Sequence, residues 1–439
     1  MQSAQFLDVL DRMIPANAFE QMCEEYAPRP RSEPRMTVSE VVSGFIYHQL
    51  QGSGSVAQSS KKLHGISMSD SAHSQRRQNL PVELFDELLS VALCPLADES
   101  AHPECFYGGY RLVGVDGTQF SVLNTPALLA ELPKAVSRRF KAAFAKLRVV
   151  SLVELGTHAP LAAKVGPTSE GEQKLAEKLW GSVPEGALVI GDRLFGTGRT
   201  LWQAKEAWGD RDIAFLARVR ENIGVKVVER LADGSAIVEV AVRDDQGNKQ
   251  TLRMREIQAR GVGVNGKHFT LRLWTSLLDE KRHPAEDLAR HYIERWEHEL
   301  YHRELKLDVR SAGVLASQTP ETALQEVAAL VLASAIIARL RVEAGTTLEV
   351  PPRRMSFLKL MKATERLWAV GQLLGELLTA EHKERMWQQY LEEIRDWAIL
   401  PERRARSCPR VLRQPVSGWP RKVDQPSRTG KVTLEVVSV

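Results

Sequence analysis

The amino-acid sequence predicts an α/β fold, with a mixed β-sheet that carries helices on its faces, a β-meander inserted into it, and helical regions before and after it. Between residues 110 and 219, short apolar runs and helical segments follow one another in the order β-β-β-α-β-α-β. From 222 to 275 the pattern changes to strand-like runs separated by turn pairs. The flanking regions carry apolar residues at helical spacing.

The composition is that of a globular protein with a large core. The chain has 439 residues, of which 43% are hydrophobic and 26% are charged, and its formal net charge is +4. This length predicts two or more packed modules, and the mild basic excess permits a nucleic-acid partner without requiring one. The four cysteines form no C-x-x-C pair, so we expect neither a disulfide framework nor a zinc knuckle.

We expect a cytoplasmic protein with no membrane partner. The N-terminal sequence, MQSAQFLDVLDRM, lacks the basic start and apolar core of a signal peptide. The longest apolar run, Val327 to Ala338, is shorter than the ~18 residues that a membrane-spanning helix needs. This run therefore predicts a buried helix.

Residues 1–100 are expected to form a helical DNA-binding region. Helices predicted at 56–63 and 69–78 are separated by a short turn, which gives a helix-turn-helix outline. Arg76 and Arg77 on the second helix are candidate DNA contacts. The alternative is an ordinary helical hairpin with a solvated face.

Residues 105–221 form the first part of the predicted sheet core. Here two short apolar runs each lead into an aspartate, Asp116 and Asp192. A strand that delivers a carboxylate at its end is the simplest account of both runs. The other elements expected in this region are strands at 146–155, 161–165 and 213–219, and helices at 172–180 and 200–208.

Residues 222–275 are expected to be an inserted β-domain. Turn pairs such as Asp233-Gly234 separate its strands. Trp274, near its end, has two interpretations: the core of the meander, which we favour, and a stacking surface for an unpaired base. The expected strands are 225–228, 237–242, 252–257 and 269–274.

Residues 276–320 contain the stretch HYIERWEHELYHRELK, His291 to Lys306, which has no Gly or Pro and predicts one continuous helix. At about 100° per residue, one stripe of about 80° carries a phenol, two guanidiniums, a carboxylate and an ammonium. Beside it, apolar residues share a face that we expect to be buried. The stripe consists of Tyr292, Arg295, Glu299, Arg303 and Lys306, and the apolar face of Ala289, Ile293, Trp296, Leu300 and Leu307.

This helix alone has three interpretations. In the first, Glu299 binds a metal ion while Arg295 and Lys306 face nucleic acid, as in a nuclease-type or transposase-type site. In the second, His298, Glu299 and His302 form the H-E-x-x-H motif of zinc metalloproteases, with the glutamate as base. In the third, the charges form a solvated face.

Three acidic residues favour the first interpretation. We expect the carboxylates of Asp116, Asp192 and Glu299 to converge in space. Together they would offer the oxygen ligands that two hard cations prefer. Two Mg²⁺ ions stabilise the attacking and leaving oxygens of an in-line phosphoryl displacement. A zinc protease would require neither aspartate.

The C-terminal part of the chain is expected to consist of a helical region and a basic tail. Residues 321–400 are expected to form helices. The tail, 401–439, is rich in Arg and Pro and is expected to be disordered, with a solvated tail as the simpler account and a nucleic-acid contact as the alternative.

Four residues of the His291 to Lys306 stretch resemble a family motif. Their spacing matches that of the Y-R-E-K box. Two residues separate Tyr292 from Arg295, three separate Arg295 from Glu299, and six separate Glu299 from Lys306. This box is typical of bacterial insertion-sequence DDE transposases of the insertion-sequence-4 type.

Two further segments resemble the other signatures of that family. Val115-Asp116-Gly117-Thr118 is similar to the first-Asp box, and Gly191-Asp192-Arg193-Leu194-Phe195 to the second. Leu194 stands where the family usually has glycine. The resemblance covers roughly residues 105 to 320 and, more loosely, the helical N-terminus.

The resemblance implies an RNase H-like catalytic core with a β-domain inserted before the glutamate helix. It implies two bound Mg²⁺ ions, or Mn²⁺ in their place, with Asp116, Asp192 and Glu299 as ligands. Tyr292, Arg295 and Lys306 would contact the DNA backbone, and Arg303 is a further candidate contact.

The implied function is cut-and-paste DNA transposition, in which strands are cleaved and joined at terminal inverted repeats. The implied partners are double-stranded DNA, as terminal repeats and target, and a second copy of the chain in a homodimeric DNA complex, in the bacterial cytoplasm at the nucleoid. The alternatives are a catalytically inactive, transposase-derived DNA-binding protein and the zinc metalloprotease.

Overall fold

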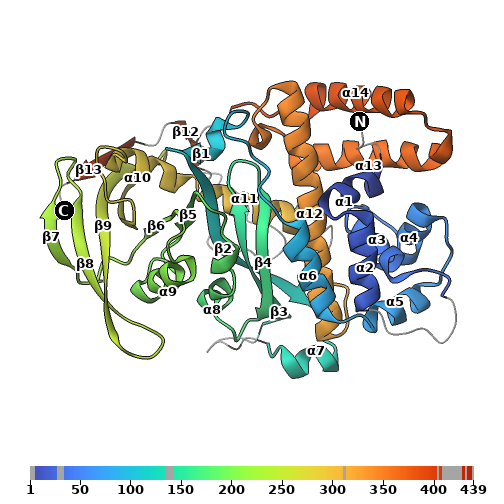
Figure 1. Cartoon of the computed structure of the whole chain (residues 1–439), viewed down its shortest axis with the longest axis horizontal. Coiled ribbons are helices and arrows are strands. Elements are labelled where there is room, and N and C mark those ends of the chain that lie inside the picture. Colours follow the sequence, from blue (N-terminus) through green and yellow to red (C-terminus); the bar gives the residue numbers. More distant parts are fainter. Residues whose placement is uncertain are drawn as a thin grey trace. The chain divides into compact units, whose positions relative to one another are not determined.

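The computed structural model describes residues 5–26, 34–134, 136, 142–309, 313–402, 405–407, 428–430 and 433–437. The chain forms two compact units: unit 1 is Met1–Ala187 with Trp296–Ile399, and unit 2 is Leu188–Arg295 with Leu400–Val439. Their elements are labelled in Figure 1. Both units combine helices and strands, which confirms the α/β class. The bounds of the six segments predicted from the sequence stay predictions.

Unit 1 contains an antiparallel sheet with Asp116 on one of its strands. The strand order is β4-β3-β2, and the short β1 also pairs with β2. The prediction that Asp116 ends its strand is wrong. β2 continues to Val122, because Phe120 and Val122 supply further buried apolar positions. The strands are β1 (Phe106–Tyr107), β2 (Tyr110–Val122), β3 (Ala145–Glu154) and β4 (Ala159–Pro167).

Helices precede this sheet in the chain, and the two predicted for the helix-turn-helix outline are confirmed. The side chain of Ser55 caps one and that of Ser69 caps the other, each accepting a backbone N–H of the first turn. Gly65 ends the first of them with φ of 73°, a conformation that glycine adopts readily. The helices are α1 (Phe6–Met13), α2 (Ala16–Glu25), α3 (Val38–Gln49), α4 (Val56–His64), α5 (Asp70–Gln78) and α6 (Val82–Ala92).

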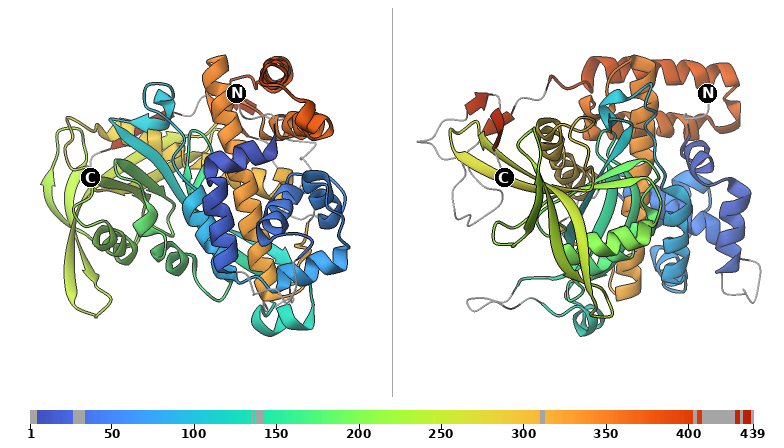
Figure 2. Two further views of the ribbon diagram at one scale, coloured as in Figure 1. Left: turned by 45° about the vertical axis from the view of Figure 1, so that its right-hand side comes forward. Right: turned by 60° about the vertical axis from the view of Figure 1, so that its left-hand side comes forward.

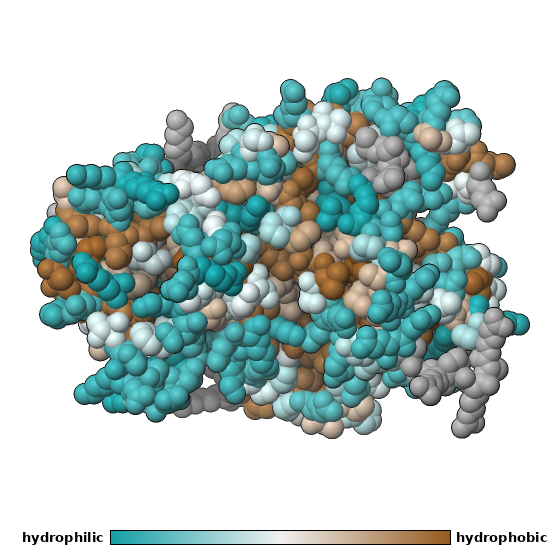
Figure 3. All heavy atoms as spheres, in the orientation of Figure 1, coloured by the Kyte–Doolittle hydropathy of each residue, from teal (hydrophilic) through white to brown (hydrophobic). Residues whose placement is uncertain are grey.

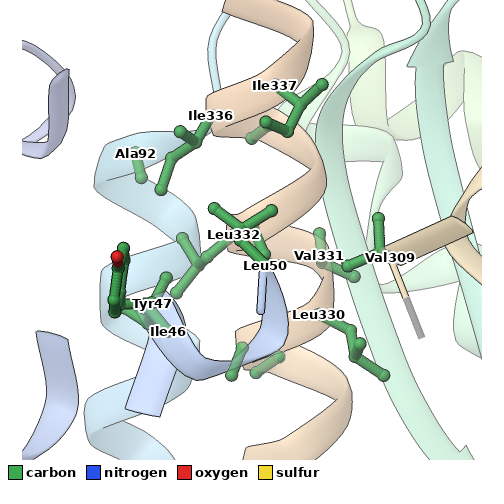
Figure 4. Packing of buried hydrophobic residues seen from close by; sticks show 14 of the residues in the cluster. Ile46, Tyr47, Leu50, Ala92, Val309, Leu330, Val331, Leu332, Ile336 and Ile337 are labelled. Atoms are coloured by element: carbon green, nitrogen blue, oxygen red, sulfur yellow. The ribbon is translucent and has the colours of Figure 1, made fainter. Parts of the chain in front are cut away.

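The core of unit 1 is organised around α12 (Pro320–Leu348), which contains the apolar run predicted to be a buried helix. α12 packs against α3, α6 and β4, and Figure 2 shows it from two further sides. Figure 4 shows side chains of α12 interleaved with those of α3 and α6. Among the described residues α12 is the one helix long and apolar enough to cross a membrane, but 89% of its most apolar window is buried inside the protein.

A helical hairpin follows α12. α13 (Phe357–Leu374) and α14 (Ala380–Trp397) pack against each other. Hydrophobic side chains reach the surface where the two helices join (Figure 3), and Leu373 is 84% exposed. The shorter helical segments of unit 1 are η1 (Pro103–Cys105), α7 (Pro126–Glu131), α8 (Glu172–Glu177), η2 (Trp180–Ser182), η4 (Pro352–Arg354) and η5 (Gly375–Leu377).

Unit 2 contains a sheet in the order β5-β6-β10-β9-β8-β7. β5 and β6 are joined by helix α9 (Gly198–Trp208), and the other neighbouring pairs are antiparallel. The strands predicted in this region are confirmed. They are β5 (Ala187–Gly191), β6 (Ile213–Arg218), β7 (Lys226–Arg230), β8 (Ala236–Arg243), β9 (Lys249–Val262) and β10 (His268–Thr275).

The prediction of one continuous helix from His291 to Lys306 is wrong. The segment consists of α10 (Ala285–Ile293), α11 (Trp296–Arg303) and a π-helical segment, η3 (Glu304–Val309). No Gly or Pro marks the break between α10 and α11, so it is imposed by tertiary contacts rather than by local propensity.

The predicted buried face of this segment is also wrong in part. Ala289 is buried, but Ile293, Trp296 and Leu307 are 42%, 56% and 64% exposed. The break at residues 294 and 295 and the wider π-helix change the direction of each following side chain. The residues buried instead are Tyr292, His298, Tyr301, His302 and Leu305.

The tail is not wholly disordered, contrary to the prediction. β13 (Thr433–Val437) pairs antiparallel with the second half of β9, and β11 (Ala405–Ser407) pairs with β12 (Arg428–Gly430). β8 pairs with β9 only as far as Glu256, and β13 forms backbone hydrogen bonds with the part of β9 beyond it. This pairing orders the chain. Most of the basic residues of the tail lie outside the described residues.

Candidate active site

Asp116 faces the side of the unit 1 sheet that α11 covers. It lies directly opposite Ser151 of β3, and opposed residues of an antiparallel pair point to the same face. Gly114 and Phe120 share this face, because alternate residues of a strand do. The Asp116 side chain is half-buried, and its Oδ1 accepts the backbone N–H of Gly117 at 2.8 Å.

The helix that carries Glu299 is fixed to this face through the preceding residue. His298 Nε2 lies 2.9 Å from the hydroxyl of Ser151. His298 also lies against Gly114, where a Cβ would come within 2.7 Å of Nδ1. Glycine at 114 therefore allows the close approach of α11 to β2, which contact each other (Figure 1).

Lys306 lies over the same face, further along β2. Its Nζ lies 5.9 Å from the ring centre of Phe120. Asp116 lies between Gly114 and Phe120 on the strand, so the segment that carries Glu299 passes over the face on which Asp116 projects. The structure thus places Asp116, the helix that carries Glu299, and Lys306 on one side of the unit 1 sheet.

Asp192 follows the fully buried strand β5 in unit 2, as predicted for this aspartate. The chain turns here, since the carbonyl of Asp192 accepts N–H groups of Phe195 and Gly196. Its Oδ1 accepts the N–H of Leu194 at 2.7 Å, which orients the half-buried carboxylate. Among the described non-glycine residues only His158 and Glu349 have positive φ, so Leu194 does not need the conformational freedom of glycine.

Tyr292 and Arg295 lie near Asp192 in unit 2. Burial raises the pKa of the Tyr292 phenol, and the charge of Asp192 raises it further, whereas Arg295 and Arg218 lower it. Arg295 also forms a hydrogen bond with the phenol. A carboxylate, a phenol and two guanidiniums therefore form one polar cluster in unit 2. Sequence reasoning missed Arg218, although its place at the end of the apolar strand β6 was a usable signal.

The amino-acid sequence of this region matches a known family. The model described as "Transposase DDE domain" matches residues 107–336, more than half of the chain. The chain belongs to this family. It is a DNA transposase, an enzyme that cleaves and transfers DNA strands.

Individual relatives agree with this assignment. The transposase is 25% identical over 354 residues to "Transposase InsG for insertion sequence element IS4" of Escherichia coli (strain K12), with 78% of this chain and 76% of the relative covered. It is 31% identical over 88 residues to "Putative transposase InsZ" of the same organism, with 20% and 29% covered.

A solved structure is also similar. It is that of the piggyBac transposase in a synaptic complex with hairpin DNA, with a TM-score of 0.48 and 8% identity. The match covers 92% of this chain and 86% of that chain.

The family assignment overturns the zinc metalloprotease interpretation. His298 and His302 both approach the hydroxyl of Ser151, at 2.9 and 3.4 Å, and their rings lie 4.6 Å apart. Burial lowers the pKa of His302 to about 3, so this side chain is neutral at ordinary pH. The two histidines pack α11 onto the transposase sheet.

DDE transposases use divalent metal ions. The donor chemistry of the three predicted ligands fits such ions, since Asp116, Asp192 and Glu299 offer only carboxylate oxygens and all three are half-buried. Asp116 and Glu299 belong to unit 1 and Asp192 to unit 2. Within the described residues, no three acidic, His or Cys side chains are grouped closely enough to hold a metal ion. The convergence of the three carboxylates stays a prediction.

The two predicted N-terminal DNA contacts interact with other parts of unit 1. Arg77 donates to the hydroxyl of Ser317 at 2.9 Å and lies over the ring of Phe45, and Arg76 donates to the carbonyl of Met36. These contacts anchor α5. The exposed side chains of this helix include Ser71, Ser74, Gln75 and Gln78.

Proposed function

We propose that the protein catalyses cut-and-paste transposition at the terminal inverted repeats of its own element, with Asp116, Asp192 and Glu299 as ligands of two Mg²⁺ ions. Mn²⁺ would serve in their place. The observation that carries the proposal is that Asp116 shares its sheet face with the helix of Glu299. When bound, the ions would polarise the scissile phosphate and lower the pKa of the attacking water.

The basic residues of the same segment bind and orient the DNA in this proposal. The Lys306 ammonium and the exposed Arg303 guanidinium compensate phosphate charge, and Arg295 offers two parallel N–H donors to phosphate oxygens. Tyr292 stays protonated because its pKa is raised, so its phenol can donate a hydrogen bond to a phosphate oxygen.

The chain would act on double-stranded DNA in the bacterial cytoplasm, as a homodimer that pairs two element ends. Cleavage at each end frees a 3′-hydroxyl, which attacks a phosphodiester of the target. A catalytically inactive DNA-binding protein derived from a transposase is the alternative, and it would bind the same DNA without cutting it.

The test combines a cleavage assay with a mobility-shift assay on DNA that carries the terminal repeats. The wild-type protein should nick this DNA with Mg²⁺ and lose the activity with EDTA. Asp116→Ala, Asp192→Ala and Glu299→Ala should abolish nicking but still shift the DNA, whereas Asp210→Ala, at an exposed aspartate, should cleave normally. Full activity in any of the first three variants would contradict the assignment, and a wild-type shift without nicking would favour the inactive alternative.

A further inference from the structure

A buried histidine contacts the segment that carries Glu299 at two residues, one on each side of this glutamate. His158 lies in the turn between β3 and β4, and its side chain is 1% exposed. Its Nε2 lies 2.9 Å from Oε2 of Glu297, and its Nδ1 lies 2.8 Å from Oε2 of Glu304. With a carboxylate on each nitrogen, both nitrogens donate, which is the imidazolium form.

A second cation completes the cluster from α12. Arg341, whose side chain is 1% exposed, donates from Nη2 to the other carboxylate oxygen of Glu304 at 2.7 Å. Its Nη1 donates to the carbonyl of Thr157 at 3.4 Å, next to His158. We call His158, Arg341, Glu297 and Glu304 the buried clamp. Its two cations and two anions compensate each other in charge.

The clamp holds the chain on both sides of Glu299. Glu297 lies on α11 just before Glu299, and Glu304 is the first residue of η3, which carries Lys306. The helix widens from α to π at the residue that both cations hold. Since a π-helix has more residues per turn than an α-helix, the change of helix type at Glu304 alters the direction in which Lys306 projects. π-helical turns are rare and often occur at functional sites.

The backbone at His158 supports a specific role for this residue. Its φ of 60° lies in the left-handed region, which is uncommon for residues other than glycine and in which histidine, asparagine and aspartate are enriched. Burying four charged groups also costs desolvation free energy, and apolar side chains of similar volume would often give equal stability. The four charged side chains fix the geometry of the segment through directed hydrogen bonds, which apolar side chains would not do.

We propose that His158 and Arg341 are positioning residues of the transposase, which fix residues 296–309 so that Glu299 and Lys306 face β2. This inference rests on the proposed function for its catalytic consequence, whereas the fixation of the segment is independent of it. Neither residue touches DNA in the proposal. They act through Glu297 and Glu304.

The test uses the full chain with Arg341→Met, Arg341→Lys and His158→Asn, in which asparagine tolerates the left-handed backbone. The matched control is Arg366→Met, which removes an exposed ion pair with Glu393. Hydrogen–deuterium exchange of residues 296–309 gives a readout that needs no activity. Single-turnover cleavage at saturating DNA and the Kd for DNA give the catalytic readout.

We expect faster exchange in residues 296–309 for Arg341→Met and His158→Asn, with exchange in β3 unchanged. Cleavage should fall about 100-fold, as for a small displacement of catalytic groups, with little change in Kd, and Arg341→Lys should recover part of the loss. The inference would be overturned if the variants fold and residues 296–309 exchange at the same rate as in the wild type. If Arg341→Met does not fold, Arg341→Lys and Glu304→Gln carry the same test.

The two proposals fail in different ways. A wild-type protein that never cleaves contradicts the proposed function, and the exchange measurement still decides whether the clamp fixes the segment. A wild-type protein that cleaves, with clamp variants that fold and cleave at the same rate, overturns the positioning role alone.

Discussion

The hydroxyl of Ser151 lies 2.9 Å from Nε2 of His298. This contact joins the residue opposite Asp116 on the sheet to the residue before Glu299 on α11. It therefore couples the position of one proposed metal ligand to that of another.

Ser151→Ala should destabilise unit 1 by about 1–3 kcal/mol, because it leaves a buried imidazole nitrogen of His298 without this partner. The free energy of unfolding from urea denaturation measures the effect. Ser90→Ala is the control, since the Ser90 hydroxyl bonds a carbonyl at the surface. Equal stability of both variants would show that the Ser151 contact contributes nothing.

The stability supplied by His158 should decrease as the pH rises. Burial alone would lower the pKa of this histidine, but Glu304 and Glu297 raise it above its ordinary value of 6.5, against the opposing charge of Arg341. A raised pKa in the folded state stabilises the protein fully below the unfolded value, and the contribution is lost as the pH rises through the folded value.

The measurement is the difference in unfolding free energy between the wild type and His158→Asn, from about pH 6 to about pH 9. The difference should be largest at the acidic end. A difference that is constant, or that grows with pH, would contradict a charged His158.

Arg255→Met should destabilise unit 2 by about 3–5 kcal/mol, because it removes a buried guanidinium and leaves the half-buried carboxylate of Asp233 and the carbonyl of His283 without this partner. The Arg255 side chain is fully buried, pairs with Asp233, and donates to the carbonyl of His283 at 2.6 Å. Asp233 in turn accepts the N–H of Ala285, the first residue of α10, at 2.9 Å.

Since α10 carries Tyr292, the same variant should also weaken DNA cleavage. Arg253→Met, at an exposed position of the same strand, is the matched control and should change neither quantity. Thermal unfolding measures the first effect and the nicking assay the second. A cleavage rate equal to that of the control would show that the contacts of Arg255 and Asp233 do not affect cleavage through α10.

Arg303→Ala and Arg77→Ala should behave differently in DNA binding. Arg303 is exposed on α11, so its loss should weaken binding to any sequence and reduce the salt slope of log K by about 1. Arg77 is half-buried, with its guanidinium over Phe45 and bonded to Ser317, so its loss should mainly lower stability. Mobility shifts across a salt series and urea denaturation distinguish the two. An unchanged salt slope for Arg303→Ala would remove it from the DNA interface.

The strands from β2 to β10 could be predicted because they are apolar runs bounded by turn residues, which is a local property. β5 is an example, since Leu188, Val189 and Ile190 lie between two glycines and are fully buried. Trp274 was correctly placed in the core, where it is fully buried and donates to Glu256 at 2.8 Å. The strand end at Asp116 was wrong because the polar side chain interrupts the apolar pattern without interrupting the strand.

The break between α10 and α11 could not be predicted, because every residue there is an adequate helix former. It follows from packing. Tyr292 is buried beside Arg295 in unit 2, whereas His298 is buried against Gly114 and Ser151 in unit 1. A single straight helix would give the side chains different directions, which is why Trp296 is exposed and not in the core as expected.

The amino-acid sequence by itself determined the family of this protein, its α/β class and the identity of the candidate ligands, because motif spacing and apolar periodicity are written along the chain. Only the tertiary structure decided which carboxylate shares a sheet face with which helix, and that His158 and Arg341 contact the segment of Glu299 through Glu297 and Glu304. The contacts of Ser151 and His158 with this segment join residues more than a hundred positions apart, and that of Arg341 with Glu304 spans 37 positions. Such distances are too long for a local sequence pattern to predict the contact.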